Sequence, residues 1–209
     1  MKIGILGAGN VGGALAQGWL RAGHEVYFGV RNPQADDVQA IVKGSQGRAQ
    51  AGGVNDAVQF GEVVVLALPW PSVKSIVNGL DLKGKVVLDC TNPILPQLAG
   101  IEVGTTTSGG EQIAELIPGA HVVKIFNTTG SGNMENPIYD GKAIPMFYCG
   151  NDAGAKVTAA GLAADLGFWP VDAGPLTNSR LLEPMAMLWV WLAYQGGMGR
   201  EFAFQIVKR

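Results

Sequence analysis

The sequence predicts an α/β fold, with a doubly wound, mostly parallel sheet and a small helical addition at the carboxyl end. Patterns typical of strands and of helices alternate along the 209 residues, which indicates a parallel sheet. Near the start, a glycine-rich turn joins a short apolar segment to a helical pattern, as in a βαβ unit. We therefore predict one domain over residues 1–175 and a carboxyl-terminal helical segment over residues 176–209.

The first thirty residues carry the βαβ pattern. Lys2–Leu6 has the length and apolar character of a strand, and Glu25–Val30 predicts a second one. Between them, Val11, Leu15 and Trp19 recur every four residues, which places them on one face of a helix. The turn that joins the first strand to this helix consists of Gly7, Ala8, Gly9, Asn10, Val11 and Gly12.

The spacing of these glycines predicts a dinucleotide site. Gly7 permits a tight turn, Gly9 lets a diphosphate approach the backbone, and Gly12 lets the helix pack close to the strand. The free amides at the start of the helix then face the anion. The spacing alone is weak evidence, but the strand before it and the helix and strand after it strengthen the prediction. The alternative is a glycine-rich turn without a ligand.

The residues after the second strand indicate which dinucleotide binds. An NAD enzyme usually carries Asp or Glu there, to bond the ribose 2′-hydroxyl. This chain has Arg31 and Asn32 instead. A guanidinium suits a 2′-phosphate in charge and in donor geometry, so we expect NADP. The alternative is that Arg31 is only a solvated loop residue.

Further strands and helices follow in alternation. The continuous apolar run at 62–68 is typical of a central strand that is covered on both faces. Pro184 is expected either to kink the last helix or to lie in its first turn. The predicted strands after the first two are 48–51, 62–68, 85–89, 121–126, 144–149 and 168–171. The predicted helices after the first are 35–43, 54–60, 72–80, 111–117, 153–166 and about 178–198.

Ligands of open α/β sheets bind beyond the carboxyl ends of the strands. Apart from the guanidinium of Arg31, that rim supplies amides, hydroxyls and apolar rings, with no further ionisable side chain expected on it. No paired carboxylates and no residues with metal-ligand spacing occur there, so neither a catalytic side chain nor a metal ligand is predicted. Hydride transfer between two rings needs alignment more than acid–base help. The cofactor residues expected on the rim, besides the turn, Arg31 and Asn32, are Pro69, Trp70, Asn92, Asn127 and Thr128.

The composition argues against several classes of partner. The net charge is −2 and no cluster of Lys or Arg occurs, so no nucleic-acid partner is expected. The longest apolar run, Met185–Tyr194, is too short to span a bilayer, and residues 1–3 lead directly into the first strand. We therefore expect a cytoplasmic protein without a membrane partner. Cys90 and Cys149 are expected to be buried free thiols, as in a reducing compartment.

Several motifs resemble those of the NADPH-dependent reductases of coenzyme F420, an 8-hydroxy-5-deazaflavin. Besides the glycine turn, they are Gly29–Arg31, Leu66–Trp70, Cys149–Asp152 and Val171–Arg180, of which the last is the most specific. The oxidoreductase domain of six-transmembrane metalloreductases is more distantly similar. The resemblance implies a Rossmann domain that carries NADP, a carboxyl-terminal part that lays the deazaflavin against the nicotinamide, and a homodimer.

The resemblance also implies roles for individual residues. Arg31 would meet the 2′-phosphate, and Leu68, Pro69 and Trp70 would lie along the cofactor. Asn127, Thr128 and Thr129 would form the loop on the nicotinamide side. The residues that it implies for the second substrate are Thr129, Asn178, Ser179 and Arg180.

The expected activity is hydride transfer between NADPH and a small-molecule redox acceptor, either coenzyme F420 or a flavin. Alternatives are an NADPH-dependent reductase of another small acceptor (an imine, a quinone or a ferric chelate) and a non-catalytic NADP sensor. The last helix favours a partner surface, because Trp189, Trp191 and Tyr194 cannot all face one small core. Within that helix, Arg180 and Glu183 are spaced to pair with each other.

Overall fold

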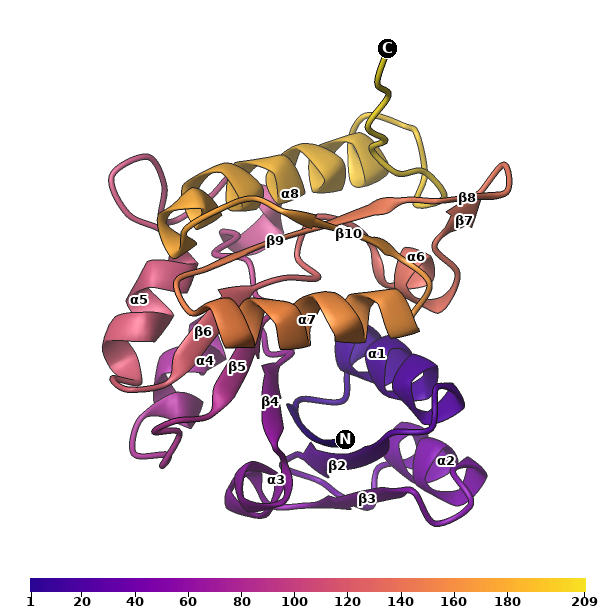
Figure 1. The fold of residues 1–209 in the computed structure, drawn as a ribbon, viewed down its shortest axis with the longest axis vertical. Helices are drawn as coiled ribbons and strands as arrows, with labels where there is room; N and C mark the ends of the chain where they lie inside the picture. The colour runs from indigo at the N-terminus through magenta and orange to yellow at the C-terminus, as the bar shows by residue number, and fades with distance from the viewer.

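A computed structural model describes all residues 1–209 as one eight-stranded sheet with helices on both faces (Figure 1). The strand order is β10-β9-β6-β5-β4-β1-β2-β3. Neighbouring strands are parallel except β6 and β9, which are antiparallel. The predicted doubly wound, mostly parallel sheet of Rossmann type is confirmed.

The elements follow the predicted alternation. The strands of the large sheet are β1 (Lys2–Leu6), β2 (Glu25–Gly29), β3 (Ala49–Gly52), β4 (Val63–Leu66), β5 (Val86–Asp89), β6 (His121–Lys124), β9 (Pro145–Gly150) and β10 (Trp169–Asp172). The helices are α1 (Asn10–Arg21), α2 (Asp36–Gly44), α3 (Val54–Phe60), α4 (Trp70–Val77), α5 (Gly109–Leu116), α6 (Ser131–Glu135), α7 (Ala153–Asp165) and α8 (Ser179–Tyr194), with short 3₁₀ turns η1 (Pro96–Leu98) and η2 (Leu176–Asn178).

The two faces of the sheet are covered by separate hydrophobic clusters. On one face, α1 and α7 pack against strand residues such as Ile3 and Ile5. On the other, α3, α4 and α5 pack against residues such as Leu6 and Leu66. Each apolar strand thus supplies side chains to both clusters, which is why its sequence is almost uninterrupted by polar residues. The burial of both faces holds the carboxyl ends of β1, β4, β5 and β6 at one rigid edge.

The structure corrects several predicted boundaries. β4 ends at Leu66 rather than at residue 68, α4 begins at Trp70, and α8 ends at Tyr194 rather than near 198. Pro184 is the sixth residue of α8, so it lies inside the helix and not in its first turn. Not predicted were α6 and the hairpin of β7 (Ile138–Tyr139) and β8 (Lys142–Ala143), because both are too short to show a periodic pattern.

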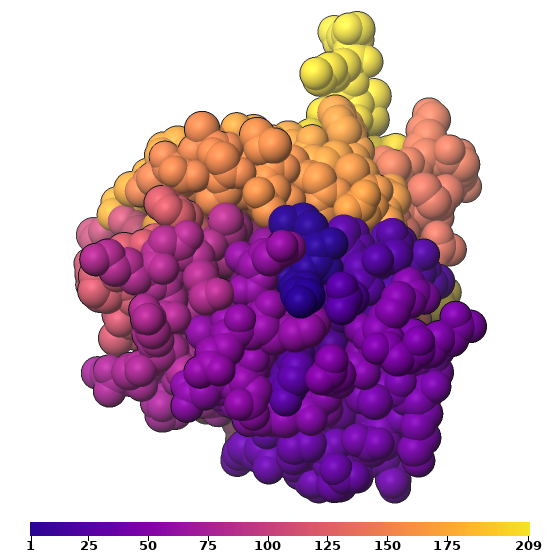
Figure 2. Space-filling model, turned by 60° about the horizontal axis from the view of Figure 1, so that its bottom comes forward, coloured from indigo at the N-terminus to yellow at the C-terminus, as the bar shows by residue number.

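After α8 the chain continues as a tail (residues 195–209) without regular structure. The tail runs back beside α6 and the β7–β8 hairpin before its last residues project from the body (Figures 1 and 2). Phe202 anchors it, because its carbonyl oxygen accepts hydrogen bonds from Asn133 of α6 and Trp189 of α8. No helix in the structure has both the length and the apolar character needed to cross a membrane.

Candidate coenzyme site

The turn between β1 and α1 gives each of its three glycines a different environment. Gly7 has a φ of +101°, which side-chain-bearing residues rarely adopt. A Cβ at Gly12 would lie 2.1 Å from the carbonyl oxygen of Gly7, so α1 can pack this closely only because Gly12 has no side chain. A Cβ at Gly9, in contrast, would meet no atom within 4 Å. The fold itself requires Gly7 and Gly12, whereas Gly9 leaves open space at the start of α1.

The start of α1 suits an anion in that space. The helix begins at Asn10, no side chain caps it, and its first turn holds no acidic residue. Gly9 and Asn10 are both exposed. Uncapped amides and the helix dipole both favour a negative charge at this point. The backbone here therefore fits a dinucleotide diphosphate.

Arg31 lies beyond the carboxyl end of β2, on the same edge of the sheet. Its side chain is exposed and takes part in none of the ion pairs of the molecule. Next to it, the Oδ1 atom of Asn32 accepts a hydrogen bond from the backbone N–H of Gln34 at 3.1 Å, which fixes the turn. The guanidinium is therefore available for a ligand phosphate.

The loops after β5 and β6 are joined by two asparagines. The Nδ2 atom of Asn92 donates to the carbonyl oxygen of Asn127 at 2.9 Å, and the Nδ2 atom of Asn127 donates to Oδ1 of Asn92 at 3.0 Å. Asn127 also donates to the carbonyl oxygen of Leu182 in α8, at 3.1 Å. Thr128 is buried beside this pair, and the hydroxyl of Thr129 accepts a hydrogen bond from Asn133. These loops therefore form a stiff wall of the rim.

The segment after β4 supplies the next part of the wall. Leu68 is half-buried and Pro69 is exposed, while the ring N–H of Trp70 donates to Glu102 at 2.8 Å. The side of the Trp70 ring lies against Gly109, where a Cβ would approach it to 3.1 Å. Leu66, Asp89 and Lys124 are register neighbours on β4, β5 and β6, so the three loops leave the sheet side by side.

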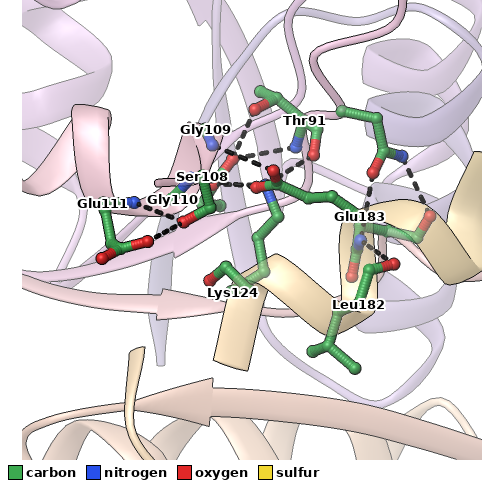
Figure 3. Close-up of polar contacts among 12 residues, drawn as sticks. Thr91, Ser108, Gly109, Gly110, Glu111, Lys124, Leu182 and Glu183 are labelled. Carbon is green, nitrogen blue, oxygen red and sulfur yellow. Dashed lines mark hydrogen bonds and ion pairs between the residues drawn. The ribbon is translucent and has the colours of Figure 1, made fainter. Parts of the chain in front are cut away.

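Directly beneath this rim lies a charged cluster that the sequence analysis did not predict. The Nζ atom of Lys124 lies 2.8 Å from Oε1 of Glu183 (Figure 3) and 2.7 Å from Oδ2 of Asp89. All three side chains are buried. The Nζ atom of Lys124 also donates to the carbonyl oxygen of Thr91 at 2.7 Å. The expectation of no paired carboxylates and no ionisable group besides Arg31 at this edge was therefore wrong. The available signal was a single charged residue inside each of three apolar segments.

Glu183 links this cluster to a helix start. Its two carboxylate oxygens accept hydrogen bonds from the amides of Gly109 and Gly110 at 2.9 and 3.0 Å (Figure 3). These amides begin α5, so the carboxylate also offsets the dipole of that helix. Burial lowers the pKa of Lys124, but the adjacent carboxylates of Asp89 and Glu183 outweigh it and raise that pKa above its usual value. The lysine is thus a permanent cation that binds α8 to the sheet.

The motif at the start of α8 makes internal contacts. Arg180 forms a bidentate pair with Glu111, at 2.8 and 2.6 Å, so the predicted pairing of Arg180 with Glu183 was wrong. Ser179 is buried, with its hydroxyl 3.4 Å from the thiol of Cys149. Asn178 donates to the carbonyl oxygen of Ala173. These contacts seat α8 against α5 and β9, and a role of the three residues toward a second substrate stays a prediction.

The histidines lie away from the rim, whereas Cys90 directly follows Asp89 at the carboxyl end of β5. Both cysteines are free and buried, as predicted. Burial raises the pKa of Cys149 to about 11, and burial together with Asp89 raises the pKa of Cys90, so neither is a thiolate at neutral pH. His24 pairs with Asp165 at 3.0 Å and His121 with Asp152 at 3.6 Å, both at the amino ends of their strands.

Comparison with known proteins agrees with this geometry. Residues 2–93 match the model of the family described as NADP oxidoreductase, coenzyme F420-dependent. A crystal structure of a putative F420-dependent NADP reductase from Arthrobacter sp. FB24 superposes over 100% of both chains, with a TM-score of 0.86 and 29% identity.

The chain carries, over residues 2–93, the domain of this NADP-dependent oxidoreductase family. It is also 30% identical to metalloreductase STEAP3 of Rattus norvegicus, over 91% of this chain but only 38% of that protein. A reductive aminase from Aspergillus terreus shares the fold, with a TM-score of 0.67 and 20% identity; the match covers 94% of this chain and 62% of the aminase chain. The resemblance found in the sequence motifs is thereby confirmed, whereas the acceptor differs among the relatives.

Proposed function

We propose that this protein binds NADP(H) along the rim and transfers a hydride between its nicotinamide and a flat redox acceptor, either a deazaflavin such as coenzyme F420 or a flavin. The observation that carries the proposal is the environment of Gly9. The fold has no internal use for a missing side chain there, but a diphosphate does. NADPH, when bound, supplies a hydride from C4 of its nicotinamide.

The residues of the chain then have separate tasks. The amides at the start of α1 hold the diphosphate, and Arg31 holds the 2′-phosphate. The wall formed by Leu68, Asn92 and Asn127 orients the nicotinamide and excludes water from one of its faces. None of these three side chains is an acid or a base. The contribution of the protein is therefore alignment of two rings to within about 3–3.5 Å rather than proton transfer.

Transfer of labelled hydride tests the proposal. NADPH deuterated on one C4 face is mixed with a 5-deazaflavin, which retains the transferred atom on carbon, and the product is examined by mass spectrometry. We expect deuterium in the reduced deazaflavin from one of the two labelled faces only. If NADPH binds but no deazaflavin, flavin, quinone, imine or ferric chelate is reduced, the protein is an NADP sensor and the proposed activity is wrong.

The pH dependence tests the absence of a proton donor. The pKa of buried Lys124 is raised, and burial raises the pKa of both thiols, so these three groups keep their protons near neutral pH. We expect no bell-shaped dependence of the maximal rate between about pH 6 and 8. The measurement is repeated with two acceptors, because an acceptor can titrate itself. A bell that persists with both would reveal a missed catalytic group.

A further inference from the structure

A pocket adjoins the proposed coenzyme path. It has a volume of about 690 Å³ and is lined by Asn10 of α1, by Gly130–Asn133, and by aromatic residues of the hairpin and α8. Asn10 is the first residue of the helix whose start suits the diphosphate. Gly130 follows directly after Asn127–Thr129, the predicted nicotinamide-side loop. The pocket therefore adjoins both the start of α1 and the loop that follows β6.

The tail closes this pocket. The ring of Phe202 stacks on that of Trp189, with centroids 5.2 Å apart and an interplanar angle of 16°. Its carbonyl oxygen accepts hydrogen bonds at 3.1 Å from the ring N–H of Trp189 and at 2.8 Å from Asn133. Trp189 also lies so close to Gly130 that a Cβ there would be 2.4 Å from its ring. Phe202 thus holds the adjacent residues Arg200 and Glu201 on the pocket wall.

The chemistry of the walls is mostly that of neutral hydrogen-bonding groups. Asn10, Ser131, Asn136 and Tyr194 offer amides and hydroxyls to the pocket. Its ionisable residues are one arginine and two glutamates, Arg200, Glu135 and Glu201. This balance disfavours a phosphate, whereas alternating donors and acceptors suit a chain of hydroxyl groups.

We propose that this pocket binds the polyhydroxylated side chain of the acceptor, such as the ribityl chain that flavins and 5-deazaflavins share, and that the tail selects for it. The proposal rests on the proposed function, because it takes the acceptor to be a ring of this class. It assigns to Phe202 a positioning role: its ring keeps Arg200 and Glu201 in place, while the flat ring of the acceptor lies at the nicotinamide.

Binding of three probes to the protein saturated with NADP⁺ tests this inference. Riboflavin carries the ribityl chain, lumiflavin lacks it, and FMN adds a phosphate to it; binding is measured by the change in flavin fluorescence. We expect riboflavin to bind about tenfold more tightly than lumiflavin, as when one or two neutral hydrogen bonds are lost. FMN should bind no more tightly than riboflavin. Equal binding of riboflavin and lumiflavin, or no binding of either, overturns the proposal.

Two variants test whether the tail causes the preference for riboflavin over lumiflavin. Phe202→Ala removes the stacking contact and should weaken riboflavin binding to the level of lumiflavin, whereas Phe202→Tyr keeps the contact and should behave like wild type. NADP⁺ is titrated separately against each protein. If Phe202→Ala weakens NADP⁺ as much as riboflavin, the pocket is part of the coenzyme site and the inference is wrong. If wild type fails to bind NADP⁺ at all, it is the proposed function that fails.

Discussion

At the scale of single residues, the glycines of the turn between β1 and α1 are of two kinds. The fold requires Gly7 and Gly12, whereas a bound diphosphate would require Gly9. Gly12 lies against the backbone of Gly7, so any side chain there pushes α1 away from the turn. Gly9 has an ordinary φ of −70° and open space where a Cβ would be. Substitutions three residues apart should therefore have opposite consequences for folding and for binding.

We predict that Gly9→Val folds normally but binds NADPH too weakly to detect at micromolar concentration, because the side chain occupies the place of the diphosphate. Gly12→Val is the matched comparison. It should lower the stability of the fold itself, in the absence of any NADPH. Circular dichroism with thermal unfolding, followed by titration with NADPH, separates the two effects. A folded Gly9→Val protein that binds NADPH like wild type contradicts the assignment.

We propose that Arg31 decides the preference between the two dinucleotides. We expect NADPH to bind more tightly than NADH, and Arg31→Ala to remove most of this difference, since a hydrogen bond to a charged group contributes about 1.5–3 kcal/mol. Affinity for NADH should change little. Arg21→Ala, at an exposed arginine of α1, serves as the control. Calorimetric titration showing equal affinities for both dinucleotides in wild type would remove the basis of this prediction.

At the scale of elements, the attachment of α8 depends on a buried ion cluster rather than on the apolar face alone. Glu183 joins α8 to the start of α5 and to β6, and the neighbouring carbonyl of Leu182 holds Asn127. The wall at the nicotinamide side is therefore coupled to the position of α8. The half-buried pair of Arg180 and Glu111 connects the same two helices nearer the surface.

Lys124→Met should destabilise the protein by about 3–5 kcal/mol, because it leaves Asp89 and Glu183 buried without their cation. The comparison is Glu111→Gln, which breaks the more solvated pair between α5 and α8 and should cost less than about 1 kcal/mol. Urea unfolding of the two variants measures both changes. Similar losses from the two substitutions would mean that the buried cluster has no special part in holding α8.

At the scale of the whole molecule, α8 presents apolar side chains to solvent. Leu181, Leu188 and Trp191 recur at helical spacing and are 66%, 51% and 47% exposed, while Trp189 between them is buried. The expectation that the aromatic residues of this helix do not all face one core is thus confirmed. An apolar stripe of this kind indicates a surface for a partner.

We predict that a second copy of the chain covers this stripe, so that wild type is a homodimer at micromolar concentration. Leu188→Glu places a charge in the stripe and should yield a monomer. The control is Val157→Glu, since Val157 is 74% exposed on α7 and isolated from the stripe. Light scattering after size-exclusion chromatography reports the mass of each. A monomeric wild type, or dissociation by both substitutions alike, contradicts the prediction.

The sequence by itself determined the local architecture and the type of coenzyme site. The strand, glycine turn and helix at residues 2–21 carry their own structural signals, because glycine spacing and apolar periodicity act over a few residues. The absence of a carboxylate after β2 likewise indicated NADP without any tertiary contact. Among the local elements, the sequence did not predict the exact ends or short pieces such as α6, because they have too few residues to show a periodic pattern.

The tertiary structure alone decided which distant residues meet. Gly109 and Glu183 are 74 residues apart, yet the Glu183 carboxylate of α8 accepts a hydrogen bond from the free Gly109 amide of α5. In the sequence, Lys124 is a single charge within an apolar strand. In the structure it lies at the centre of a buried cluster, because β5 and α8 each place a carboxylate beside it. The tail has no periodic pattern, and its place is set by Trp189 and Asn133. Such pairings depend on how the chain closes its long loops, which no local pattern encodes.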